Sequence, residues 1–209
     1  MTEELADDLD TALRFAVATL STAIEHDWQT PARDLRWTCW ETLEHVADDL
    51  FSYAGQIVAP TTGMTDYVPF VYDSVREGGP ECTIRSQPAQ GNAGLLDVVT
   101  TCGALLSSAV RTAPSDRRGW HPYGVSDPGG FAAMGTVETL VHVYDVAEAL
   151  RVSWEPTGDV VRRALDRLFP HAPSDTEPWP ALLWATGRIP LTDRPRRTAW
   201  RWDSTVRSG

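Results

Sequence analysis

Glu138 and His142 are the residues whose types and spacing most directly suggest chemistry. They stand four positions apart in the segment GTVETLVHVYD. In an α-helix, residues at this spacing lie side by side, with their Cβ atoms about 5–6 Å apart. Because bonds from a divalent metal to imidazole nitrogen and carboxylate oxygen are about 2.0–2.2 Å long, one ion could bridge such a pair. The spacing therefore indicates part of a metal site.

A third ligand has to come from another helix. His45, in the segment TLEHVADDL, is the best donor because it lies mid-helix among apolar neighbours. Two histidines and one carboxylate leave a coordination position open, which is typical of catalytic rather than structural zinc sites. Asp145, three positions after His142, lies on the same side of its helix and could orient that imidazole through its second ring nitrogen. We therefore predict a divalent metal, most simply zinc, on His45, Glu138 and His142.

A structural interpretation competes with this one. Glutamate and histidine occur four apart in many helices by chance, so the motif needs structural context before it counts as a site. The three residues would then form a polar network in the core of a helical dimer. His121, in the segment RGWHPYG, has similar alternatives. It could be a fourth metal ligand or a general base, or it could simply pack within a loop.

The elements that must position these residues are helices. Apolar residues recur at helical spacing over residues 4–25, 94–111 and 131–151. A fourth helix is predicted from Thr38 to about residue 58, because Thr38 and Glu41 have the spacing of a capping box. Four long helices joined by loops indicate an all-α fold, a four-helix bundle.

The rest of the chain is organised around this bundle. Prolines and glycines interrupt residues 60–91, which predicts a long connection in which 83–86 could be extended. Shorter helical patterns cover 158–169 and 179–187. We therefore expect a bundle at residues 1–152 and a small C-terminal appendage at 153–209. The appendage is either helical or adds strands, in which case the fold class would be α+β.

Composition excludes several classes of protein. Eighteen basic against 29 acidic residues give a formal net charge of -11, which repels nucleic-acid backbones. No basic start followed by an apolar block is present, and no uninterrupted apolar stretch has the length of a membrane span. We expect a cytoplasmic protein, monomer or homodimer, without membrane or nucleic-acid partners. Its three cysteines are odd in number and lack CxxC spacing, which predicts free thiols at Cys39, Cys82 and Cys102.

Two segments carry a resemblance to a known family. RWTCWETLEHVADDLFSYAGQ and AAMGTVETLVHVYDVAEAL resemble the two metal-ligand helices of the DinB-like superfamily, specifically the mycothiol-dependent maleylpyruvate isomerase type of actinobacteria. The broader superfamily has two histidines four apart on its last bundle helix, whereas this subgroup has glutamate and then histidine, as at Glu138 and His142 here. His45 takes the ligand position of the second helix. The likeness extends more weakly to ALLWATGRIPL near the C-terminus.

The resemblance implies an enzyme that uses mycothiol, a small-molecule thiol, as its cosubstrate. The sulfur would take the open coordination position of zinc, which lowers the pKa of a thiol, and the thiolate would add to a small electrophilic substrate. Isomerisation, conjugation or displacement could follow. An anionic substrate would need a cationic clamp, for which Arg188 and the cluster Arg194 to Arg197 are the candidates. A metal-containing binding protein without turnover and a metal-dependent hydrolase remain alternatives.

Overall fold

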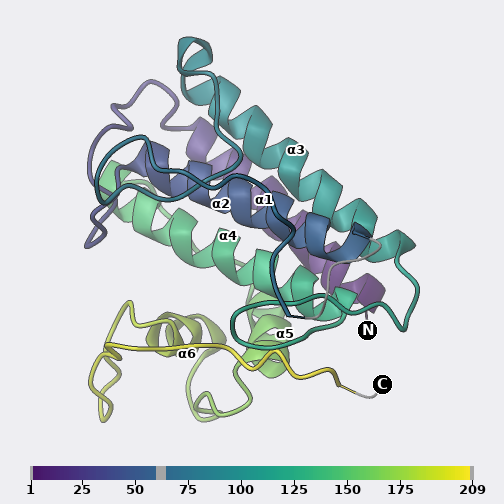
Figure 1. Cartoon of the computed structure of the whole chain (residues 1–209). Coiled ribbons are helices and arrows are strands. Elements are labelled where there is room, and N and C mark those ends of the chain that lie inside the picture. The colour runs from purple at the N-terminus through teal and green to yellow at the C-terminus, as the bar shows by residue number, and fades with distance from the viewer. Residues whose placement is uncertain (1, 60–64, 208–209) are drawn as a thin grey trace.

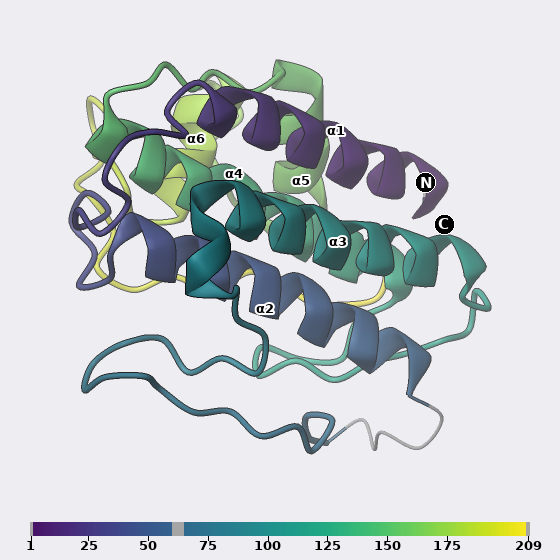
Figure 2. The same cartoon turned by 90° about the horizontal axis from the view of Figure 1, so that it is seen from above.

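Four long helices, two running in each direction, form a bundle in the computed structural model, which describes residues 2–59 and 65–207 (Figures 1 and 2). The helices are α1 (Thr2–Ser21), α2 (Cys39–Val58), α3 (Gly91–Thr112) and α4 (Pro128–Leu150). The prediction of an all-α bundle is confirmed. Only isolated β-bridges occur in the described residues, so the alternative of an α+β fold does not apply to them.

The start of α2 follows from its capping box. The hydroxyl oxygen of Thr38 accepts a hydrogen bond from the backbone N–H of Glu41 at 3.1 Å. The Glu41 carboxylate in turn accepts one from the backbone N–H of Thr38 at 2.9 Å. These bonds satisfy two amide groups that a helix start otherwise leaves free. They fix the first residue of α2, and with it the face on which His45 lies.

Helix α4 is the centre of the molecule, with nearly all of its residues buried. A helix that is apolar on all sides is stable only when other elements cover every side. The other three long helices cover one side of α4, and the C-terminal elements cover the opposite side (Figure 1). At Gly135, a side chain would have its Cβ 2.7 Å from Leu106 and 3.0 Å from Leu50, so only glycine allows this close approach.

A long connection, residues 65–87, runs beside α2 (Figure 2). Two buried carboxylates of α2 hold its last part. Asp48 accepts hydrogen bonds from the backbone N–H groups of Thr83 and Ile84 at 2.6 and 2.7 Å, and Glu44 accepts one from that of Ser86 at 3.0 Å. Residues 83–86, which the sequence suggested could be extended, are held by these backbone hydrogen bonds and form no strand. Residues 60–64 of the predicted connection lie outside the described part of the chain.

The C-terminal part contains α5 (Gly158–Leu168), α6 (Pro178–Ala185) and an irregular segment that crosses beneath α4 (Figure 1). The backbone N–H of Asp203 donates to the carbonyl oxygen of Leu168 at 2.8 Å, which fastens the end of this segment to α5. This path brings residues of the segment 186–202 to the side of α4 that carries Glu138 and His142. The appendage therefore takes part in the site described below.

The helix α3 lies in the most apolar long segment of the described residues. By length and composition alone, the segment Pro88–Thr112 could cross a membrane, although polar residues interrupt its apolar positions. Half of its most apolar stretch is buried in the bundle, as expected for a core helix that packs against α1 and α2.

Candidate metal centre

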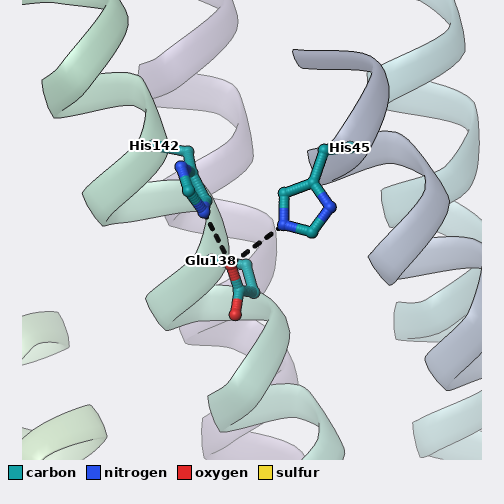
Figure 3. Close-up of side chains that lie close together, drawn as sticks. All are labelled: His45, Glu138 and His142. Carbon is teal, nitrogen blue, oxygen red and sulfur yellow. Dashed lines mark ion pairs between the residues drawn. The ribbon is translucent and has the colours of Figure 1, made fainter. Parts of the chain in front are cut away.

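The structure brings His45, Glu138 and His142 together between α2 and α4 (Figure 3). Nε2 of His142 lies 3.1 Å from Oε2 of Glu138, and Nε2 of His45 lies 3.9 Å from the same oxygen. The ligand atoms of all three residues lie within 4.8 Å of one another. The i, i+4 spacing accounts for the pair on α4, and the packing of α2 against α4 places His45 across the gap.

This geometry fits a divalent metal. With bond lengths of about 2.0–2.2 Å, two ligand atoms of a tetrahedral ion lie about 3.3 Å apart. The observed separations of 3.1 and 3.9 Å bracket that value. The donor set, two imidazole nitrogens and one carboxylate oxygen, suits zinc and similar transition metals. Since three protein ligands are available, a position would remain for a further ligand.

Burial and mutual interaction shift the pKa values of the three groups. Burial, followed by the charge of His142, lowers the pKa of His45 to about 4. His45 is therefore neutral at pH 7, with a nitrogen lone pair available for a metal. Burial alone would raise the pKa of Glu138, but its hydrogen bond and ion pair with His142 outweigh burial and hold that pKa below its ordinary value. Glu138 is therefore a carboxylate.

Asp145 lies behind His142, as its spacing predicted. Its Oδ2 is 3.4 Å from Nδ1 of His142, and that nitrogen has no hydrogen-bond partner among the described residues. The same oxygen accepts hydrogen bonds from Nη2 and Nε of Arg188 at 2.9 and 3.3 Å. Arg188 thus comes from the C-terminal segment to the rear of the site, where both it and Asp145 are buried.

A cavity of about 1060 Å³ opens in front of the three candidate ligands. Its walls combine residues of α2, of the loop before α4 and of the C-terminal segment. Aromatic side chains are prominent among them: Trp37, Tyr53, Tyr67, Tyr72, Tyr123, Trp200 and Trp202. A space of this volume accommodates a small-molecule ligand and its cosubstrate.

His121 lines this cavity but does not belong to the group of three candidate ligands. Its Nδ1 accepts a hydrogen bond from the backbone N–H of Tyr123 at 3.1 Å, which leaves the proton of the neutral ring on Nε2. Burial lowers its pKa to about 4. His121 is therefore a neutral imidazole at the cavity wall, which is consistent with either a catalytic or a packing role.

The arginine candidates differ in their surroundings. Arg196 and Arg197 line the cavity together with Arg188. Arg196 forms an ion pair with Asp34 at 2.7 Å, whereas the guanidinium of Arg197 lies over the ring of Trp184, 5.2 Å from its centroid. Arg194 also stacks on Trp184 and is not among the residues that line the cavity.

Asp49 is the residue near the site whose position was not predicted. Its Oδ2 lies 3.4 Å from Nε2 of His45, the same nitrogen that faces Glu138. Burial and the charge of Glu138 raise the pKa of Asp49 well above its ordinary value. The i, i+4 spacing of His45 and Asp49 could have pointed to this contact, because it is the same spacing that identified Glu138 and His142.

The cysteines lie apart from this arrangement of ligands. All three are free and buried, as predicted. Burial raises the pKa values of Cys39 and Cys102 to about 11 and that of Cys82 to about 12. None is a thiolate at neutral pH, so none has the character of a protein nucleophile.

Comparison with protein families agrees with this geometry. A family model described as the mycothiol maleylpyruvate isomerase N-terminal domain matches residues 7–147, which span the bundle from α1 to α4. The chain belongs to this family. The matched residues contain all three candidate ligands of this chain and end before Arg188. No match was found among curated proteins or solved structures.

Proposed function

We propose that this protein is a metal-dependent enzyme that uses a low-molecular-weight thiol, mycothiol, to isomerise or transfer a group on a small electrophilic substrate. The main support is one observation: two histidines and a glutamate of a mycothiol-related family converge at the wall of a cavity of about 1060 Å³. The alternative of a purely structural network explains the convergence less well. Such a network would be closed, whereas these donors face open space.

His45, Glu138 and His142 would hold the ion, and zinc is the metal that this donor set suits best. A bound zinc ion would lower the pKa of a thiol, so that the thiolate is available at neutral pH. The chain would supply three further things. Its aromatic walls exclude water, Arg197 is an accessible cation for an anionic substrate, and neutral His121 could accept a proton from a reacting group.

Arg197 is our candidate for the cationic clamp because its surroundings leave it free for this role. Among the described residues, no carboxylate forms an ion pair with Arg197, whereas Arg196 pairs with Asp34 and Arg188 pairs with Asp145. A guanidinium that stacks on an aromatic ring keeps its N–H groups available for a carboxylate. Arg197→Gln should therefore raise KM for an anionic substrate and leave metal content unchanged.

Two measurements test the proposal in order. Elemental analysis of protein purified without a His tag should give one divalent metal per chain, and Glu138→Gln, which keeps the side-chain shape, should lose most of it. Turnover of electrophilic carboxylic acids should then require mycothiol. A metal-free wild-type protein would leave the three residues as a polar network. Metal without turnover would indicate a binding protein, and turnover without thiol would indicate a hydrolase.

A further inference from the structure

Arg188 is a buried cation that is paired with a buried anion, Asp145. Only 2 % of the surface of Asp145 and 7 % of the surface of Arg188 is exposed. Three of its five N–H groups have partners. Nη2 and Nε donate to Oδ2 of Asp145 at 2.9 and 3.3 Å, and Nη1 donates to the carbonyl oxygen of Thr186 at 3.0 Å. A guanidinium that binds a substrate usually keeps its paired N–H groups available for that substrate. In Arg188 these groups are instead directed at Asp145.

We propose that Arg188 is a positioning residue for the metal ligand His142, acting through Asp145, and that it is not the group that binds the substrate. The inference rests on the proposed function, since it assumes that His142 binds a metal. It assigns a role in the site to a residue that lies beyond the matched residues 7–147.

The geometry supports this role step by step. Oδ2 of Asp145 faces Nδ1 of His142 at 3.4 Å, and Nδ1 has no hydrogen-bond partner among the described residues. A carboxylate at this place favours a proton on Nδ1, which leaves the lone pair of Nε2 directed at the metal position beside Glu138. Arg188 fixes that same Oδ2 from the other side. The three groups therefore form a row in which each orients the next.

Burial explains why the row needs a cation. A buried carboxylate is stable in the protein interior when a counter-charge and hydrogen bonds pair with it. The guanidinium of Arg188 supplies both to Oδ2 of Asp145. It also stops Asp145 from turning away, because two N–H groups hold one oxygen.

The backbone around Arg188 is itself anchored to the bundle. Nη2 of Arg33, in the loop before α2, donates to the carbonyl oxygen of Arg188 at 2.9 Å. The N–H of Arg188 donates to the carbonyl oxygen of Leu183, in α6, at 2.7 Å. One local contact and one contact from a distant part of the chain thus set the position of the backbone that carries the guanidinium. The C-terminal segment would thereby complete a metal site whose ligands all lie in the bundle.

Metal affinity provides the test, measured by competition with a chromophoric chelator on the full-length protein. We expect Asp145→Asn and Arg188→Gln each to weaken zinc binding by about 10–100-fold, as is usual for groups that orient a metal ligand. Arg188→Lys should retain much of the affinity, because it keeps the cation. Combining Arg188→Gln with Asp145→Asn should cost little more than Asp145→Asn alone, since the two residues act through one path.

Arg197→Gln is the matched control, because Arg197 lines the same cavity without contacting Asp145. It should leave zinc affinity unchanged.

Unchanged zinc affinity in Arg188→Gln, with a raised KM for substrate, would overturn the inference and return Arg188 to the role of substrate clamp. Additive losses in the double variant would also overturn it. A wild-type protein that binds no metal would overturn the proposed function and this inference together. If circular dichroism shows that Arg188→Gln does not fold, the zinc affinity of Arg188→Lys, compared with the affinities of wild type and of Asp145→Asn, still tests the inference.

Discussion

Two pairs of polar residues alternate along one stretch of α2, and they are used in opposite ways. Glu44 and Asp48 are buried carboxylates whose oxygens accept hydrogen bonds from backbone N–H groups of residues 83–86. His45 and Asp49 come one residue later in each case, and they face Glu138 and the cavity. Both pairs have the i, i+4 spacing, so spacing alone does not separate them.

The difference between the pairs lies in their partners. Backbone N–H groups satisfy the first pair, so it holds a loop in place and has little capacity left for a ligand. In the second pair, Nε2 of His45 lies 3.4 Å from Oδ2 of Asp49 and 3.9 Å from Oε2 of Glu138, and the other face of the pair is the cavity. Polar groups in such a place are stabilised when a further group binds them. Donors that converge beside open space are therefore better candidates for a metal site than carboxylates whose oxygens already accept backbone hydrogen bonds.

The sharpest test of this comparison is removal of a candidate ligand. His45→Ala and His142→Ala should each reduce zinc affinity by more than about 100-fold, because a direct ligand contributes more than a residue that only orients one. Both variants should stay folded, since the apolar core of the bundle does not involve these side chains. Affinity and helical content would be measured together. Full zinc affinity in His45→Ala would show that α2 supplies no ligand.

Asp48→Ala tests the other pair and should have the opposite phenotype. Two hydrogen bonds to a buried carboxylate would be lost and two backbone N–H groups left without partners. We expect the free energy of unfolding to fall by about 3 kcal/mol. Zinc stoichiometry should stay at the wild-type value. Urea denaturation and elemental analysis of the same preparation check both statements, and a loss of zinc with unchanged stability would reverse the assignment of the two pairs.

A smaller effect is expected at His121, which lines the cavity outside the group of three. Its pKa is about 4 in the folded protein and about 6.5 when unfolded. Below pH 6.5 the unfolded chain therefore takes up a proton that the folded protein does not, and stability falls as pH drops toward 4. His121→Asn keeps an acceptor for the N–H of Tyr123 but does not titrate.

Between pH 7 and pH 5, wild type should lose about 1–2 kcal/mol more stability than His121→Asn. Comparing the two proteins removes the contributions of His45 and of metal binding, which both share. Denaturation curves at the two pH values provide the measurement. Equal losses would place His121 in solvent rather than in the cavity wall.

The smallest effect should follow replacement of the three cysteines. Their buried thiols have raised pKa values, so a folded triple variant, with Cys39, Cys82 and Cys102 changed to Ala, should keep mycothiol-dependent turnover and zinc. Activity assays with and without added thiol would check this. Loss of turnover in a folded, zinc-loaded variant would move the nucleophile onto the protein.

The predictions that succeeded came from local spacing. The capping box at Thr38 gave the start of α2, and the pair Glu138 and His142 gave the side of α4 that faces His45 and the cavity, because side chains three or four apart on one helix must be neighbours. That His45 would meet this pair across the bundle came from the family resemblance. Helix ends were less accurate: the first helix ends at Ser21, and turns follow it where further helix was expected.

The predictions that could not be made from local spacing concern contacts between distant parts of the chain. Arg188 reaches Asp145 across 43 positions, and its carbonyl oxygen meets Arg33 across 155 positions. Such contacts depend on the path of irregular segments, which periodicity does not encode. For the same reason, the sequence pattern does not separate Asp48 from Asp49, although one meets a loop and the other faces His45 and the cavity.

Gly135 lets α4 pack closely against its neighbours beside the candidate metal centre. It stands one turn before Glu138 on α4, where a single added methyl group would press against Leu106 and Leu50 from two other helices. A side chain at this position would force the ends of these leucine side chains to shift, and α4 carries Glu138 three residues further along, facing His45 of α2. A bundle widened by a few tenths of an ångström would still bury its leucines, yet it would spread ligand atoms whose bonds tolerate only about 0.2 Å. The apolar packing of the bundle thus affects the spacing of the candidate metal ligands.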